Sequence, residues 1–149
     1  MLCEKHNTYK VHTIGDCYVS MGFKNHRNRN PENEALSMVK MAFDMIDVIE
    51  QVNAEYDLGI AMRIGLHTGE VIAGITGTNI VRYDIYGQDV SMANKMESSG
   101  AANRVNISAV TRGFLELAAP NMFSYEYNMD IKVLDTVLES YFVSVGNPS

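Results

Sequence analysis

An acidic residue lies at the centre of the first pattern in the chain that could support chemistry. Residues 9–19 read YKVHTIGDCYV, which places two apolar, β-favouring runs on either side of Gly15 and Asp16. This pattern predicts a tight hairpin with a carboxylate at its tip. A carboxylate held on a rigid turn suits a hard metal ion. Gly-Asp is also common turn chemistry without any catalytic role, so both interpretations of Asp16 stay open on these residues alone.

Four further side chains have types that could bind a substrate or a metal. Arg63 lies in the predicted strand 60–67, where it could contact phosphate or pair with an acid. Ser91 and Lys95 are four residues apart on a predicted helix and therefore share a face. His67 is the last residue of the same predicted strand, but no second His or Cys stands at metal-ligand spacing. We interpret His67 as structural.

Length and composition limit the classes of function. A chain of 149 residues is enough for one domain with a real core. The formal net charge of −6 has the wrong sign for a surface that gathers nucleic-acid phosphates, so we expect no nucleic-acid partner. Two cysteines cannot build a disulfide framework, which favours a reducing, intracellular setting. No apolar run approaches the roughly 20 residues of a membrane helix.

Hydrophobic periodicity and capping residues predict the elements that hold these side chains. A long helix should begin at Pro31, with Asn30 as its cap, and a second capped helix should follow Ser108 to about residue 117. A third helix is expected over 88–97, ended by Gly100. Beyond the first hairpin, strands are expected at 60–67 and 71–75, paired as a second hairpin, and at 83–87, 104–107, 123–133 and 139–145. The pattern predicts an α+β fold, a ferredoxin-like antiparallel sheet with helices packed on it.

Four blocks taken in order make the pattern specific. They are KVHTIGDCY at 10–18, MRIGLHTGEV at 62–71, YDIYG at 83–87 and VSMANKMES at 90–98. Together they closely resemble the class III adenylyl and guanylyl cyclase catalytic domain. The resemblance covers nearly the whole chain and weakens after Pro120. It implies a single cyclase catalytic domain over 1–149 that lacks the family's N-terminal strand and helices.

The resemblance implies an enzyme whose active sites form between two such domains. The reaction would convert GTP or ATP to the cyclic monophosphate and pyrophosphate, with two divalent ions, Mg²⁺ or Mn²⁺, neutralising phosphate charge. Asp16 matches the family's second metal aspartate, while the first belongs to an earlier strand that this chain starts too late to contain. Arg63 matches an arginine that contacts the nucleotide's phosphates.

Departures from the family pattern indicate which half of a cyclase this is. Ser91 and Lys95 replace an Asn that orients the ribose and an Arg that stabilises the transition state, and residues 133–136 replace a Lys-Gly-Lys-like segment. The pattern resembles the metal-donating half of heterodimeric cyclases. His12 and Asp84 stand where the family reads the purine, and in such a half they would line the degenerate second pocket.

These implications define the expected function. We expect half of a purine nucleotide cyclase that needs a second cyclase domain, binds GTP or ATP, and is inactive as an isolated fragment. The sequence of residues 13–18 resembles that of protist cyclases, many of which are guanylyl cyclases. We therefore expect a cytoplasmic domain that is attached to a membrane only through other parts of a parent protein. A catalytically silent regulatory or dimerisation domain is the alternative. An unrelated ferredoxin-like binding domain would explain the fold but not the ordered blocks.

Overall fold

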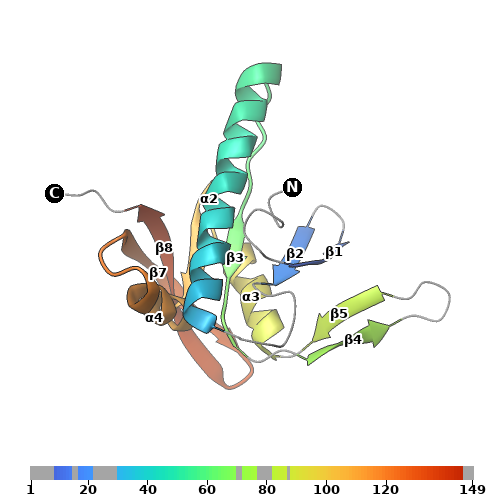
Figure 1. Cartoon of the computed structure of the whole chain (residues 1–149), viewed down its shortest axis with the longest axis vertical. Coiled ribbons are helices and arrows are strands. Elements are labelled where there is room, and N and C mark those ends of the chain that lie inside the picture. Colours follow the sequence, from blue (N-terminus) through green and yellow to red (C-terminus); the bar gives the residue numbers. More distant parts are fainter. Residues whose placement is uncertain are drawn as a thin grey trace.

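A mixed four-stranded sheet forms the centre of the computed structural model, which describes residues 9–14, 17–21, 30–69, 72–76, 82–86 and 88–145 (Figure 1). The strand order is β3-β6-β8-β7. The bounds are β3 (Ile64–Leu66), β6 (Val105–Ser108), β8 (Thr136–Val145) and β7 (Phe123–Val133). β3 and β6 run parallel, and the other two pairs are antiparallel. The predicted α+β fold is confirmed, with one parallel pair that the antiparallel prediction did not include.

Helices cover both faces of this sheet. Their bounds are α2 (Pro31–Tyr56), α3 (Gln88–Ser98) and α4 (Ala109–Ala118). α2 and α4 share one core with the sheet, in which Val39, Ile107 and Leu115 are fully buried. α3 packs on the sheet through a second core, in which Met92 and Met96 are fully buried. Each such side chain contributes about 1.5–3 kcal/mol relative to an exposed position, so both layers are held mainly by apolar burial.

Two antiparallel hairpins lie beside this sheet in Figure 1. β1 (Tyr9–Ile14) pairs with β2 (Cys17–Met21) up to Ile14 opposite Cys17, which confirms the first predicted hairpin, although Gly15 and Asp16 lie outside the described residues. β4 (Ile72–Thr76) pairs with β5 (Arg82–Tyr86). The predicted hairpin between 60–67 and 71–75 is therefore wrong, because β3 pairs with β6 and β4 pairs with β5.

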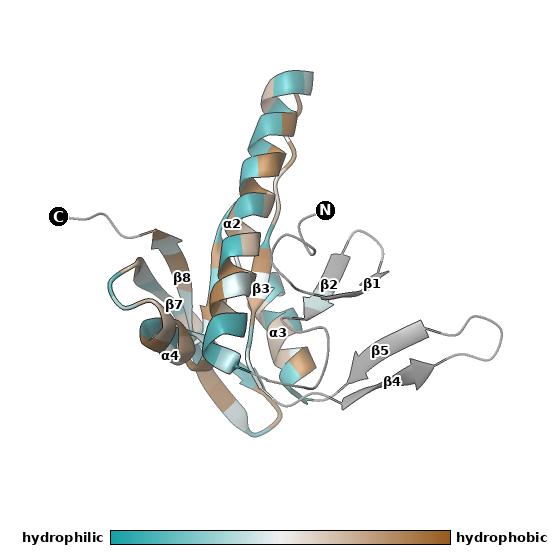
Figure 2. Ribbon diagram, viewed as in Figure 1, coloured by the Kyte–Doolittle hydropathy of each residue, from teal (hydrophilic) through white to brown (hydrophobic). Residues whose placement is uncertain are grey.

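α2 begins where its sequence predicts. Asn30 has an extended backbone and its side-chain oxygen accepts a hydrogen bond from the backbone N–H of Asn33 at 3.1 Å, while Pro31 occupies the first turn. The buried face runs from Ala35 to Ile46. No residue of 47–56 is buried, and this end of α2 projects beyond the sheet (Figure 1). Hydrophobic residues continue into the projecting end (Figure 2).

The segment that returns from this projection is fixed by side-chain amides. The side chain of Asn53 accepts from the backbone N–H of Ile60 at 3.0 Å and donates to its carbonyl oxygen at 2.7 Å. Asn103 similarly pairs with the backbone of Met62, accepting from its N–H through the side chain at 3.2 Å and donating to its carbonyl from the main chain at 2.7 Å. These contacts satisfy the backbone groups of Ile60 and Met62 without a sheet partner.

β7 contributes to both cores because it contains a bulge. Its register against β8 shifts between Tyr127 and Met129. Phe123 lies in the core under α2 and α4, whereas Ile131 and Val133 lie in the core under α3. All three have odd residue numbers and would point to one face of a regular strand. The extra residue at the bulge reverses the alternation.

Candidate functional site

Arg63 is held at the junction between β3 and the end of α3. It immediately precedes β3, and its Nη2 atom lies 3.3 Å from Oε1 of Glu97, in the last turn of α3. The Arg63 side chain is 51% exposed and that of Glu97 is 30% exposed. An ion pair at this exposure contributes about 0–1 kcal/mol, so the guanidinium can exchange Glu97 for another anion at small cost. Sequence reasoning proposed either a phosphate contact or an acidic partner, and the structure provides an acidic partner.

Gly65 lets β3 approach the backbone of α3 directly. A Cβ atom built on Gly65 would lie 2.5 Å from the carbonyl carbon of Met96 and 2.6 Å from Cα of Glu97, and closer still to the Glu97 amide nitrogen. A side chain at this position would therefore push the strand and helix apart. The close approach explains how Glu97 reaches Arg63 from the neighbouring element.

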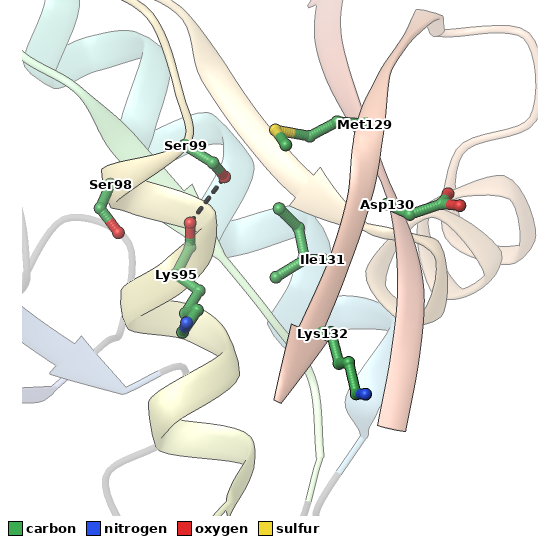
Figure 3. A pocket seen from close by; sticks show the side chains of 7 residues that line it. All are labelled: Lys95, Ser98, Ser99, Met129, Asp130, Ile131 and Lys132. Atoms are coloured by element: carbon green, nitrogen blue, oxygen red, sulfur yellow. Dashed lines mark hydrogen bonds between the residues drawn. The ribbon is translucent and has the colours of Figure 1, made fainter. Parts of the chain in front are cut away.

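Ser91 and Lys95 share one face of α3, as their spacing predicts, and both are exposed. Lys95 borders an open hollow of about 280 Å³ between the end of α3 and β7 (Figure 3). The hollow is lined by Lys95, Ser98, Ser99, Met129, Asp130, Ile131 and Lys132. In Figure 3 the Asp130 side chain points away from α3, and its carboxylate accepts a hydrogen bond from the Tyr127 hydroxyl at 2.9 Å. Two positively charged side chains, Lys95 from α3 and Lys132 from β7, therefore border this hollow.

His67 lies at the other end of β3, inside a buried hydrogen-bond network. Its side chain is 2% exposed, with Nδ1 2.6 Å from Oγ of Ser108 and Nε2 2.8 Å from Oδ1 of Asp89. The hydroxyl groups of the next residue, Thr68, and of Thr111 are 2.9 Å apart. Both ring nitrogens of His67 thus have protein partners. The structural interpretation of His67 is confirmed.

The remaining predicted site residues lie on the two hairpins. His12 is in β1 and Asp84 is in β5, and these two strands contact each other. The strands that carry the predicted purine-binding positions are therefore neighbours. The structure describes the backbone of these two residues but not their side chains. Asp16 lies outside the described residues. Within the described ranges, no three His, Cys, Asp or Glu side chains converge so as to hold a metal ion.

Two acidic residues at the site escaped sequence reasoning. Glu97 and Asp89 lie near opposite ends of α3, where one contacts Arg63 and the other contacts His67. Neither is close to its partner along the chain, and both look like ordinary acids on a solvent-exposed helix face. No local spacing in the sequence links these two acids to β3. They can be identified as site residues only from the packing of α3 on that strand.

Comparisons with known proteins identify the family. The family model for the adenylate and guanylate cyclase catalytic domain matches residues 1–144. A guanylate cyclase of Toxoplasma gondii is 33% identical over 144 residues, and guanylate cyclase alpha of Plasmodium falciparum is 31% identical over 144 residues. The chain belongs to the adenylate and guanylate cyclase catalytic domain family. The resemblance inferred from the four sequence blocks is confirmed.

Solved structures agree with this assignment. The guanylate cyclase domain of RhGC from Catenaria anguillulae, solved in complex with GTP, matches with a TM-score of 0.81 and 27% identity over 98% of this chain and 77% of that chain. The matched region covers 93% of this chain but only 3% of the Toxoplasma relative, and 94% against 3% for the Plasmodium relative. Among the helices that the structure describes, none combines the length and apolar character needed to cross a membrane.

Proposed function

We propose that this chain is one half of a purine nucleotide cyclase, which works at an interface with a second cyclase domain. The substrate is GTP or ATP. The likeness to guanylate cyclases supports GTP over ATP for this chain. In the reaction the ribose 3′-oxygen forms a bond to the α-phosphorus. The bond from that phosphorus to the pyrophosphate breaks, pyrophosphate leaves with the electron pair of that bond, and the hydroxyl proton passes to solvent water. Family membership and the likeness to a GTP-bound cyclase domain support this proposal.

One observation carries the assignment to a half site. Ser91 and Lys95 are both exposed on α3, at the positions where the family pattern has the ribose-orienting Asn and the transition-state Arg. A serine hydroxyl is too short to replace the amide, and lysine lacks the planar fork that binds phosphate in a bidentate manner. The partner domain supplies Asn, Arg and the phosphate-binding Lys. The chain alone is then inactive.

Arg63 is the described residue that this half contributes to the substrate. Its side chain is half exposed and its pair with Glu97 is of the weak surface type, so a nucleotide phosphate with more negative charge displaces Glu97 readily. The guanidinium fork can then donate two parallel hydrogen bonds to phosphate oxygens. In this proposal Glu97 keeps the empty guanidinium oriented toward the site.

Asp16 is the proposed metal ligand of this half. The described residues do not complete a metal site, so the proposal for Asp16 depends on its place in the family pattern. A Mg²⁺ or Mn²⁺ ion bound there supplies positive charge that neutralises phosphate oxygens and makes the attacking hydroxyl more acidic. His12 and Asp84, on neighbouring strands, line the second, degenerate pocket in this proposal.

A composite cyclase tests the proposal. This chain, joined to a preceding strand that carries the family's first metal aspartate, is combined with a cyclase domain that has Asn, Arg and Lys. Cyclic nucleotide is measured with Mn²⁺ and GTP or ATP. We expect Arg63→Ala to raise KM at least about tenfold, because it removes a hydrogen bond to a charged group, and Asp16→Ala to abolish turnover.

Arg112 provides the matched control. It is an arginine with its own carboxylate partner, Glu116 at 2.8 Å, and it lies on α4, which packs on the face of the sheet opposite to α3. Arg112→Ala should leave KM unchanged. An unchanged rate in Asp16→Ala would reject the metal role, and turnover by the pure chain would reject the half-site assignment.

The second candidate function is a silent regulatory or dimerisation domain. The two replacements on α3, Ser91 and Lys95, favour it, because they remove catalytic groups from one side of any dimer. Under this alternative the composite assembles but binds no nucleotide. Sedimentation and equilibrium binding with GTP and ATP, measured on the same preparation, separate the two functions.

A further inference from the structure

β3 is attached to α3 at both of its ends. Before the strand, Arg63 pairs with Glu97 at 3.3 Å; after it, His67 pairs with Asp89 at 2.8 Å. Between these pairs Gly65 touches the helix backbone. Glu97 lies in the last turn of α3 and Asp89 in its first turn. The three contacts therefore fix the position of α3 along the direction of β3. Apolar packing alone would define this position less strictly.

The hydrogen bonds around His67 have a defined direction. A carboxylate only accepts, so Nε2 of His67 carries the proton shared with Asp89. Oγ of Ser108 accepts the backbone N–H of Thr111 at 3.3 Å, and in the neutral imidazole that is protonated on Nε2 its hydroxyl donates to Nδ1 of His67 at 2.6 Å. A chain of donors thus runs from the first turn of α4 through Ser108 and His67 to Asp89. It joins the N-termini of two helices that lie on opposite faces of the sheet.

The order of residues in this chain resembles a hydrolase triad, but its geometry excludes that chemistry. Ser108 is fully buried, and its oxygen already caps α4. A substrate carbonyl could not reach it. What the network can do is hold elements in place.

We propose that Asp89 and His67 are positioning residues for Arg63. This inference rests on the proposed function, in which Arg63 contacts the phosphates of the nucleotide. Asp89 and His67 fix the first turn of α3, Gly65 is the point of closest approach, and Glu97 holds the guanidinium at the far end. α3 spans about 16 Å, from 11 residues at about 1.5 Å each. Release of the first turn lets the helix tilt about Gly65, which moves Glu97 and with it the orientation of Arg63.

Substitution of Asp89 tests this coupling in the composite cyclase. We expect Asp89→Ala to raise KM for the nucleotide about two- to fivefold, because it acts through the weak surface pair of Arg63 with Glu97, with kcat within about twofold of wild type. Asp89→Asn keeps an acceptor for Nε2 of His67 and should restore KM to near the wild-type value. A purely structural role would reduce the folded fraction, which lowers the maximal rate at unchanged KM. That result would overturn the proposal.

Gly69 offers a second variant that leaves the carboxylate present. A Cβ at Gly69 would lie 2.7 Å from Oδ1 of Asp89 and closer still to Cγ and Oδ2. Gly69→Ala therefore displaces the carboxylate from His67 and should raise KM in the same direction as Asp89→Ala. The matched control is Asp47→Ala, which changes an exposed aspartate on the projecting end of α2 and should leave KM unchanged.

A double-mutant cycle determines whether Asp89 acts through Arg63. If it does, Asp89→Ala adds little to the defect of Arg63→Ala, because the group being positioned is already absent. Defects that multiply would overturn the coupling. An Arg63→Ala variant with wild-type KM would instead reject the proposed function, so the two failures are distinguishable.

The network itself has a readout that is independent of activity. The ¹⁵N chemical shifts of the His67 imidazole, measured on the full chain, report which nitrogen carries a proton. We expect a proton on Nε2 in the wild type and a clear shift of that signal in Asp89→Ala. An Nε2 without a proton would overturn the proposal, because the carboxylate of Asp89 has no hydrogen to donate.

Discussion

Replacing Gly65 with alanine should separate β3 from α3 and destabilise the domain. The added Cβ would lie 2.5 Å from the carbonyl carbon of Met96 and 2.6 Å from Cα of Glu97. Both are backbone atoms of a helix, which cannot rotate away as the end of a flexible side chain can. Overpacking in a core costs about 1–3 kcal/mol, and backbone neighbours place this case at about 3 kcal/mol or more. For a domain of this size that corresponds to a fall in Tm of roughly 6–12 °C.

Urea and thermal denaturation followed by circular dichroism measure this change, and Gly113 supplies a control of opposite sign. Gly113 lies inside α4, and a Cβ there would meet no heavy atom within 4 Å. Gly113→Ala should therefore stabilise the chain by about 0.5–1 kcal/mol through its higher helix propensity. A Gly65→Ala variant as stable as wild type would refute the close contact between β3 and α3. Equal effects of the two substitutions would also refute it.

Three further outcomes follow from contacts in the structure. Asn30→Ala should lower the free energy of unfolding by about 1 kcal/mol in urea denaturation, because α2 loses its N-cap. Asn53→Ala should speed hydrogen exchange at the Ile60 amide, which loses its acceptor, while amides of the buried sheet keep their protection. Burial raises the pKa of Tyr125 above the ordinary value of 10.0, so its stabilising contribution is complete below about pH 10 and declines as pH rises through the folded-state pKa. In an ultraviolet titration, Arg112→Ala should raise this pKa further, because it removes a guanidinium 4.7 Å from the ring centroid.

Local signals in the sequence predicted the elements that local interactions determine. Asn30 caps α2 and Ser108 caps α4 through contacts three residues away, and both helices begin where these residues indicate. The same is true of Ser91 and Lys95, whose spacing alone places them on one face of α3. The first hairpin was also predictable, since only two residues separate its two strands in the sequence.

Long-range contacts account for what the sequence did not predict. The expected strand 60–67 is reduced to 64–66, because Asn53 and Asn103 take the backbone groups of the residues before it. β3 then pairs with β6 in a parallel arrangement, and no turn sequence between the two strands indicates this pairing. Asp89 reaches His67 only because α3 packs on β3. Sequence spacing identifies candidate groups, but the identity of their partners depends on packing.

The bulge in β7 has a consequence for how this domain can change during evolution. Because the bulge sets which face each later side chain occupies, deletion of one residue near Asn128 would turn Ile131 and Val133 toward solvent and their charged neighbours toward α3. A substitution in β7 affects the packing of one side chain, whereas an insertion or deletion changes which face of the sheet every later side chain of the strand occupies. Homologous chains should therefore vary in sequence here far more readily than in length, and insertions should accumulate in the turn after Val133 instead.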